Sequence, residues 1–259
     1  MMKQVLMQVH RHLIDSKRML FFILPFCGIA CLQYPTEDIP VRDMRLSYYI
    51  MAENAEEASI SVRLHDADDI YFFDLTLSGE DTLYIEHDGE SYVLDEEDKT
   101  KLISPDVRYT KTIPYSDITE PFTLVFDRPS GQYKTNLFLA NDFSVSVQND
   151  EPFAFSSLSS MPLDVRWTSI QNVADVDISV RGTDCANDSS GTGIVENTGQ
   201  TQLEVRFDDP IVQVGLMDQL CTVKVHVLAG TVGYSTDFGE ASIYGAQQRS
   251  SHIKALYLP

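Results

Sequence analysis

Hydrophobic and polar residues alternate along most of this chain from about residue 44 onward. Ile60, Val62 and Leu64 alternate with Ser61 and Arg63, for example. A period of two places successive side chains on opposite faces of a β-strand. Short runs of this kind recur, separated by turn residues and without a sustained helical period, so the pattern predicts an all-β protein built from antiparallel sheets.

Two turns stand out within this pattern. Asp88 and Gly89 lie between alternating runs and predict a two-residue hairpin, because both residues tolerate the positive φ that a type I′ turn requires. The stretch DRPSGQ at 127–132 predicts a second turn between two strands.

The polar stretch QNDEP at 148–152 separates two series of predicted strands. The segments 44–149 and 150–259 are each close to the ~100 residues of an immunoglobulin-like domain. We therefore predict two tandem antiparallel β-sandwiches, one in each segment. Within the second, LDVRWT at 163–168 resembles the second strand of fibronectin type III-like domains, and the resemblance implies that Trp167 points inward and fills the core.

An apolar run, LFFILPFCGIAC, occupies residues 20–31 and follows the basic pair Lys17 and Arg18. It is short for a transmembrane helix, which needs roughly 20 apolar residues, so residues 1–30 are predicted to be a cleaved leader. Residues 31–43 follow, and their prolines and acids predict a tether that holds the first domain away from its anchor.

Ala30 precedes Cys31, and this arrangement resembles the lipobox of bacterial lipoproteins, although Gly28 stands where that pattern usually has Leu. The resemblance implies that Cys31 is the first mature residue and carries the lipid. Leu32 after the cysteine implies the outer membrane rather than retention in the inner one. The alternatives are an ordinary secretory leader cut near Ala30 and an uncleaved anchor helix.

The charge of the chain is strongly negative, at −20 overall. Residues 31–149 hold 24 acidic and 9 basic side chains, and residues 150–259 hold 14 and 6. A nucleic-acid partner needs a basic face, so the composition argues against one. The acids are spread over turns and strands, which is typical of a solvated surface.

Cys185 and Cys221 are the two cysteines of the predicted second domain. Cys221 shares the parity of Val223 and should face inward. Because a leader implies an oxidising compartment, we predict that the two bond, which stabilises the domain by roughly 3–4 kcal/mol in the chain-entropy model. A metal pair or a reactive thiol are the alternatives, but no further Cys or His stands at zinc-ligand spacing, and no cofactor is predicted.

No sequence motif of a catalytic site is present: there is no H-E-x-x-H, G-x-S-x-G, glycine-rich phosphate loop or C-x-x-C. His226 is expected on the exposed side of a strand. Asp66, Asp68 and Asp69 lie between two predicted strands and are weak candidates for calcium ligands, because they lack EF-hand spacing. We predict that the protein is not an enzyme.

The ending TDFGEASIYGAQQRS, with RGTDC and LCTVKVHV, resembles a group of bacterial envelope proteins with a cysteine-paired, Ig-like final domain. The resemblance implies fold and location but no activity. The prediction is a lipid-anchored envelope protein, bound to the bilayer through Cys31, that serves as a binding or structural module for an envelope protein or a glycan. The alternatives are a secreted or surface-attached hydrolase on a β scaffold and a calcium-dependent adhesion module.

Overall fold

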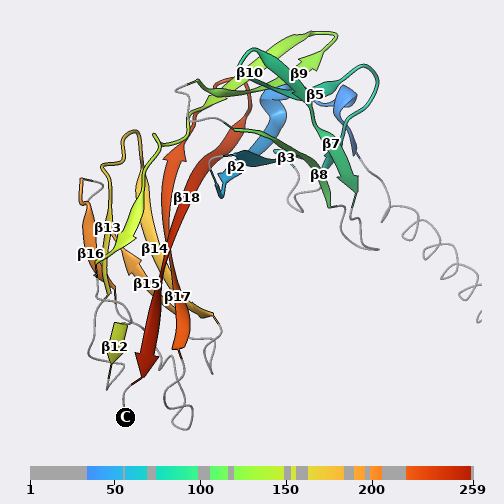
Figure 1. Ribbon diagram of the computed structural model, residues 1–259. Helices are drawn as coiled ribbons and strands as arrows, with labels where there is room; N and C mark the ends of the chain where they lie inside the picture. The colour runs from blue at the N-terminus through green and yellow to red at the C-terminus, as the bar shows by residue number, and fades with distance from the viewer. Residues whose placement is uncertain are drawn as a thin grey trace, which may run out of the picture.

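The computed structural model describes residues 34–54, 56–68, 74–98, 106–115, 120–148, 153–155, 163–183, 190–195, 199–205 and 220–257. Within these ranges the chain forms strands and two short 3₁₀ helices (Figure 1), which confirms the predicted all-β sandwich class. The 3₁₀ helices are η1 (Thr36–Asp38) and η2 (Val41–Asp43). The strands are β1 (Tyr34–Pro35), β2 (Met44–Ala52), β3 (Glu57–Asp66), β4 (Leu75–Thr76), β5 (Thr82–His87), β6 (Glu90–Val93), β7 (Asp95–Asp98), β8 (Val107–Pro114), β9 (Phe122–Arg128), β10 (Gly131–Leu137), β11 (Val145–Val147), β12 (Phe153–Phe155), β13 (Leu163–Trp167), β14 (Asp175–Thr183), β15 (Ser190–Ile194), β16 (Gln202–Val205), β17 (Leu220–Val232) and β18 (Glu240–Tyr257).

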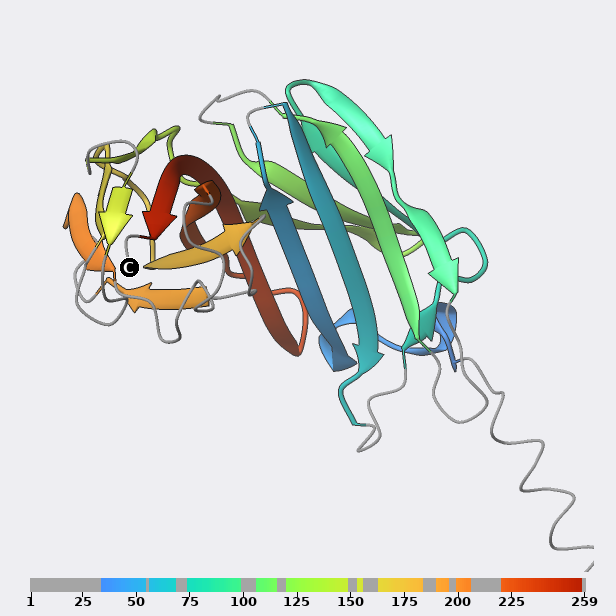
Figure 2. The ribbon, with the colours of Figure 1, turned by 60° about the horizontal axis from the view of Figure 1, so that its bottom comes forward.

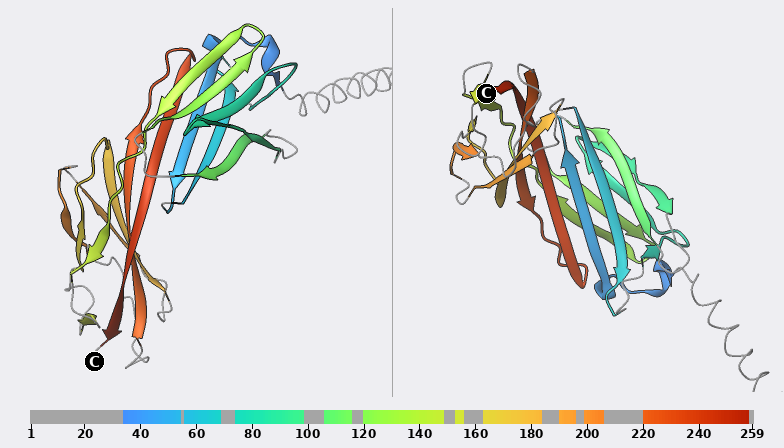
Figure 3. Two further views of the ribbon diagram at one scale, coloured as in Figure 1. Left: turned by 45° about the horizontal axis from the view of Figure 1, so that its top comes forward. Right: turned by 90° about the horizontal axis from the view of Figure 1, so that it is seen from below.

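One long sheet runs through the molecule in the order β15-β14-β17-β18-β2-β3-β8-β7, with β12 also beside β18. Two smaller sheets pack on it: β10-β9-β5-β6 at one end and β11-β13-β16 at the other. The long sheet turns between the two ends, and both smaller sheets lie on the outside of that turn (Figures 1 and 3). The molecule is therefore two sandwiches that share one layer.

Strand β18 joins the two sandwiches. Its first half pairs in parallel with β2, from Glu240 opposite Arg45 to Gln247 opposite Ala52. Along most of its length it also pairs antiparallel with β17. Ile243 near its start belongs to the first core, and Ile253 near its end belongs to the second. The same face of one strand thus seals both cores.

The two hydrophobic cores divide between Leu139 and Ala140, and the first core also takes Phe238 and Ile243 from far along the chain. This division differs from the predicted one at residues 148–152, because residues 233–247 return to the first sandwich. The return is stabilised by pairing of β18 with β2 and by burial of Phe238 and Ile243, which a period-two pattern alone does not reveal.

Both predicted turns are present. β5 and β6 pair up to His87 opposite Glu90, which leaves Asp88 and Gly89 as a two-residue loop with φ of 52° and 74°. β9 and β10 pair up to Arg128 opposite Gly131 around the Pro-Ser turn. Local turn chemistry was sufficient to predict these hairpins.

The predicted tether needs a correction for residues 35–43. Thr36 and Val41 are buried, and β1 pairs with β4. The prolines shape two short 3₁₀ turns that lie against the first sandwich, so this segment is packed rather than free. The backbone carbonyls it presents are bound by Arg128, as described below.

Trp167 is 4% exposed and belongs to the second core, as the resemblance implied. It lies on β13, in the layer opposite the long sheet. Among the described residues, no helix is long and apolar enough to cross a membrane.

Candidate functional site

The long sheet has one face that neither smaller sheet covers. Figure 2 shows this face of the sheet. Strands β2, β3 and β8 lie toward the viewer at one end of the molecule, and β14 and β15 lie toward the viewer at the other. Side chains of one parity on each strand point into the cores, and those of the other parity point to this uncovered face. Because the smaller sheets lie outside the turn, the uncovered face is the inner side of the bend (Figures 1 and 3).

Five residues form one cross-strand row on this face, which we name the tyrosine row: Val232, Tyr244, Tyr49, Ser61 and Thr110. Each is the direct partner of the next, across β17, β18, β2, β3 and β8. Val232 is 52% exposed and Tyr49 is 45% exposed. Directly paired residues share a face, so the row presents aromatic and hydroxyl groups over about 19 Å.

A groove of about 620 Å³ lies over this row, lined by both tyrosines and by hydroxyl side chains of β3 and β8. Its far edge, at β7, carries charges that are satisfied locally. Lys111 Nζ lies 2.9 Å from Asp95 Oδ2, and Thr110 donates to Glu97 Oε1 at 3.1 Å. The middle of the groove therefore offers stacking surface and hydroxyls, while the charges stand at its rim.

Tyr244 lies where the two sandwiches meet. Its hydroxyl donates to Asp175 Oδ1 at 3.3 Å, above Gly230 of β17. A Cβ at position 230 would lie 2.3 Å from the Tyr244 hydroxyl and 1.7 Å from the carboxylate of Asp175, so only glycine leaves room for this contact. Burial and the neighbouring Asp175 carboxylate raise the pKa of Tyr244 to about 12. The phenol is therefore protonated and can act as a hydrogen-bond donor at physiological pH.

Three arginines lie on the same face as the tyrosine row, on β2, β3 and β8, each beside a carboxylate. Arg45 lies 2.6 Å from Glu240, and Arg63 and Arg108 both contact Asp106. Their side chains are partly buried, so they form a fixed polar border to the groove rather than a mobile charged surface.

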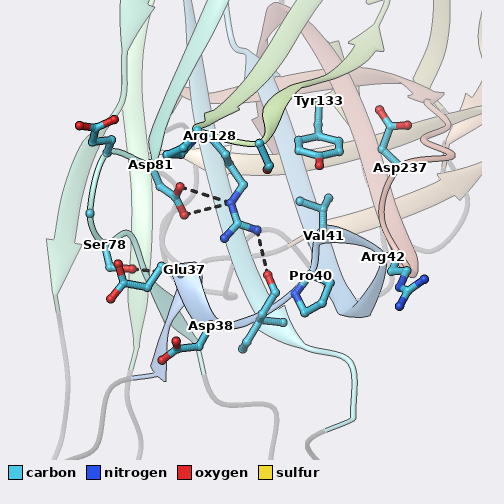
Figure 4. Close-up of a pocket in the computed structure, with 15 residues that line it drawn as sticks. Glu37, Asp38, Pro40, Val41, Arg42, Ser78, Asp81, Arg128, Tyr133 and Asp237 are labelled. Atoms are coloured by element: carbon cyan, nitrogen blue, oxygen red, sulfur yellow. Dashed lines mark hydrogen bonds and ion pairs between the residues drawn. The ribbon is translucent and has the colours of Figure 1, made fainter.

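A second groove, of about 630 Å³, lies where residues 37–42 cross the first sandwich (Figure 4). Arg128 forms its floor, with a side chain that is 8% exposed. Nη1 donates to the carbonyl of Ile39 at 2.8 Å and Nη2 to that of Thr36 at 2.7 Å, while Nε lies 3.2 Å from Asp81 Oδ2. The guanidinium also lies 5.2 Å from the ring centre of Phe126. Arg128 therefore fastens the N-terminal segment to the sandwich.

Thr36 completes this fastening from the other side. Its hydroxyl donates to Asp81 Oδ2 at 2.7 Å and accepts from the backbone N–H of Ser78 at 3.2 Å. Glu37 N–H in turn donates to the Ser78 hydroxyl at 3.1 Å. The buried carboxylate of Asp81 thus has both an arginine and a hydroxyl as partners, which offsets the cost of burying it.

The predicted site residues fall in several places. Cys31, Cys185 and Asp69 lie outside the described residues, so lipidation and the disulfide remain predictions. Cys221 is the second residue of β17. Asp66 ends β3, and its carboxylate accepts from the Asp68 N–H at 3.0 Å. Within the described ranges, no three His, Cys, Asp or Glu side chains are placed to hold a metal ion.

Among the described residues, His65 and His87 lie on β3 and β5 of the first sandwich, and His226 and His252 lie on neighbouring strands of the second. His65 Nδ1 is 3.0 Å from the buried Asp74, and His87 stacks on Phe122 with ring centres 3.9 Å apart. His226 points to the uncovered face, as predicted, but is half-buried. Burial lowers the pKa of His226, Lys224 lowers it further, and Glu53 acts in the opposite direction.

The sequence did not predict the tyrosine row or the role of Arg128. Tyr49 and Tyr244 are almost 200 residues apart in sequence, and only the parallel pairing of β18 with β2 makes them neighbours. Arg128 stands in a turn motif that gave no sign of burial.

Comparison with known proteins gives no family. No family model matches the chain, and no curated protein matches it in sequence. Among solved structures, the titin Ig tandem domains A164-A165 align over 84% of this chain and 94% of theirs, at 10% identity and a TM-score of 0.23. The full ectodomain (Ig1-Ig3) of mouse nectin-like molecule 4 aligns over 83% of this chain and 65% of its own, at 8% identity and a TM-score of 0.25. TM-scores this low do not establish a shared fold. The all-β sandwich class follows instead from the strands and the two cores of this chain.

Proposed function

We propose that this protein is a non-catalytic binding module of the bacterial cell envelope, anchored in the outer membrane by a lipid on Cys31. The observation that supports a binding role is the uncovered inner face of the bent sheet, with its groove along the tyrosine row. An aromatic and hydroxyl surface of this width, which neither of the described smaller sheets covers, suits recognition of an extended partner.

The packing of the N-terminal segment supports the anchored arrangement. Pro35 already pairs with β4, and the four residue steps from Cys31 to Pro35 span at most about 14 Å. A lipid on Cys31 would therefore hold the first sandwich close to the bilayer surface. The second sandwich, at the other end of the shared sheet, lies away from this attachment point (Figure 1).

Membrane fractionation of two cysteine variants tests the anchor. We expect the Cys31→Ala protein to move from the membrane fraction to the soluble fraction, because it lacks the acceptor for the lipid. Cys27→Ala, four residues earlier in the same leader, is the matched control and should stay with the membrane. A Cys31→Ala protein that still sediments with the membrane would show that the leader is retained as an anchor helix, and a soluble wild-type protein would contradict anchoring altogether.

A further inference from the structure

A third hollow, of about 530 Å³, lies where the chain leaves β10, beside the end of β17 and the loop that follows β13. We name it the junction hollow. Phe138 and Tyr234 line it and are 50% and 85% exposed, which makes them the two most exposed aromatic side chains of the described residues. Val232 lines it as well and is also the first member of the tyrosine row, so the hollow adjoins one end of that row.

The backbone around the junction hollow is held by contacts that do not involve the exposed rings. The Thr231 hydroxyl donates to the carbonyl of Phe138 at 2.7 Å, and the N–H of Gly233 donates to the carbonyl of Ile243 at 3.0 Å. A Cβ at position 233 would lie 2.5 Å from Cγ2 of Ile243 and 3.1 Å from a backbone oxygen of β10, so glycine leaves room for this close approach. The backbone that carries the two rings is therefore fixed before a ligand binds.

Two asparagines add hydrogen-bonding groups beside the rings. Oδ1 of Asn136 accepts from the Thr123 hydroxyl at 2.8 Å, so the donor end of this amide points away from Thr123. Asn172 adopts a φ of 60°, a conformation that asparagine tolerates better than most residues. The loop that carries it is fastened by Asn141, which donates to the carbonyl of Ser169 at 3.3 Å. The junction hollow thus combines exposed rings with side-chain amides on a fixed backbone.

The charge around the junction hollow indicates what kind of ligand it suits. All of the described residues that line it are uncharged, although 22% of the residues of this chain are charged. The net charge of −20 repels both a nucleic acid and a second copy of the chain. The hollow therefore suits a neutral ligand that has an apolar face for the rings and polar groups for the amides.

We propose that the junction hollow binds one sugar of a neutral β-1,4-linked glycan, and that the rest of the glycan lies along the tyrosine row. The proposal rests on the proposed binding role and names its partner class. The C–H groups on one face of a pyranose pack on an aromatic ring, while the hydroxyls at its edge bond to amides. Equatorial β-1,4 linkages keep successive sugars in an extended ribbon, which suits a row that crosses five strands.

Calorimetric titration of the full-length protein with cellohexaose and with chitohexaose tests the proposal, in a detergent without a sugar head group. We expect at least one of these two β-1,4-linked hexasaccharides to bind. Added salt should change the affinity by less than about twofold, because the ligand carries no charge to be screened. Maltohexaose has the composition of cellohexaose but α linkages that curve the chain, so it should bind more weakly than the better β-linked probe.

Variants of the exposed rings test the site. Phe138→Ala/Tyr234→Ala should weaken binding at least about tenfold, because it removes both stacking surfaces. Tyr234→Phe keeps the ring and should change the affinity by less than about threefold. Tyr84→Ala is the control, because it removes a tyrosine from the outward side of β5 in a smaller sheet, and it should leave the affinity unchanged. All of these variants should keep the wild-type circular dichroism spectrum.

Several results would overturn the proposal. One is that neither cellohexaose nor chitohexaose binds, and another is that maltohexaose binds as tightly as the better of the two. Equal weakening by Tyr84→Ala and by Phe138→Ala/Tyr234→Ala would show that the hollow is not the site. A dimer in sedimentation velocity that Tyr234→Ala dissociates would overturn the proposal in favour of a second copy of the chain as the occupant.

Two further results separate this inference from the proposed function. Glycan binding that is lost in Tyr49→Ala but kept in Phe138→Ala/Tyr234→Ala would overturn the role of the hollow and leave the tyrosine row as the binding surface. Failure of glycan binding in a protein that fractionates with the membrane would overturn the glycan and leave the anchor intact. Conversely, binding that depends on Tyr234 in a protein that proves soluble would support the glycan inference and contradict the anchor.

Discussion

At the scale of single residues, the described structure depends on a few buried polar groups that join segments far apart in sequence. Arg128 is the clearest case, because one guanidinium binds two carbonyls of the N-terminal segment and the carboxylate of Asp81. The two charged side chains are 8% and 2% exposed, so neither can be solvated if its partner is removed. Such pairs add little net stability compared with an apolar pair, but breaking one is costly.

We therefore expect Arg128→Met to lower the free energy of unfolding by about 3–5 kcal/mol, since it leaves Asp81 buried without its cation. Urea unfolding followed by circular dichroism measures the change. The segment 35–43 should also become sensitive to protease, because its carbonyls lose their donors.

Lys134→Met is the control for this prediction. Lys134 forms an exposed pair with Glu86 at 2.9 Å, which is worth no more than about 1 kcal/mol. Replacing both buried partners, in Arg128→Met/Asp81→Leu, should restore part of the lost stability. Equal losses for Arg128→Met and Lys134→Met would show that the buried pair is not special.

At the scale of elements, local signals in the sequence predicted the strands and hairpins but not their long-range partners. Asp88 and Gly89 are enough to predict a hairpin, because the turn type follows from two residues. β18 was not predicted as one strand, because the residues on its core side between Ile243 and Ile253 are mostly polar or glycine. Its pairing with β2 joins residues almost 200 positions apart, and it is decided by burial of Phe238 and Ile243 in the first core.

The same limit applies to the candidate site. The tyrosine row is a product of register, since its members come from strands that only the fold brings together. The tether prediction failed because prolines and acids were taken as signs of an unpacked segment, whereas the polar backbone of residues 36–39 is satisfied by the buried Arg128.

A chain that ends at residue 148 tests the role of β18. It contains the predicted first domain except for its last residue, but lacks the strand beside β2 and the core residues Phe238 and Ile243. We expect it not to fold, because it exposes a long hydrophobic sheet edge and leaves a cavity in the core. Amide proton shifts confined to the narrow range of an unfolded chain would bear this out, and a dispersed, native-like spectrum would contradict it.

At the scale of the whole molecule, the shared sheet makes two cores into one bent unit, with an inner face that neither described smaller sheet covers. In the proposed arrangement, the lipid lies next to the N-terminal segment at one end, and the second sandwich lies at the other. The tyrosine row lies on the inner face between them. This order would place a bound partner at a defined distance from the membrane.

The mass of the mature N-terminal peptide, taken from protein isolated from membranes, tests the anchored module most directly. We predict a chain that begins at Cys31 and carries the mass of a diacyl or triacyl lipid. A chain that begins at Met1 or Met19, or one cut elsewhere with an unmodified Cys31, would contradict the anchor on which the proposed function depends.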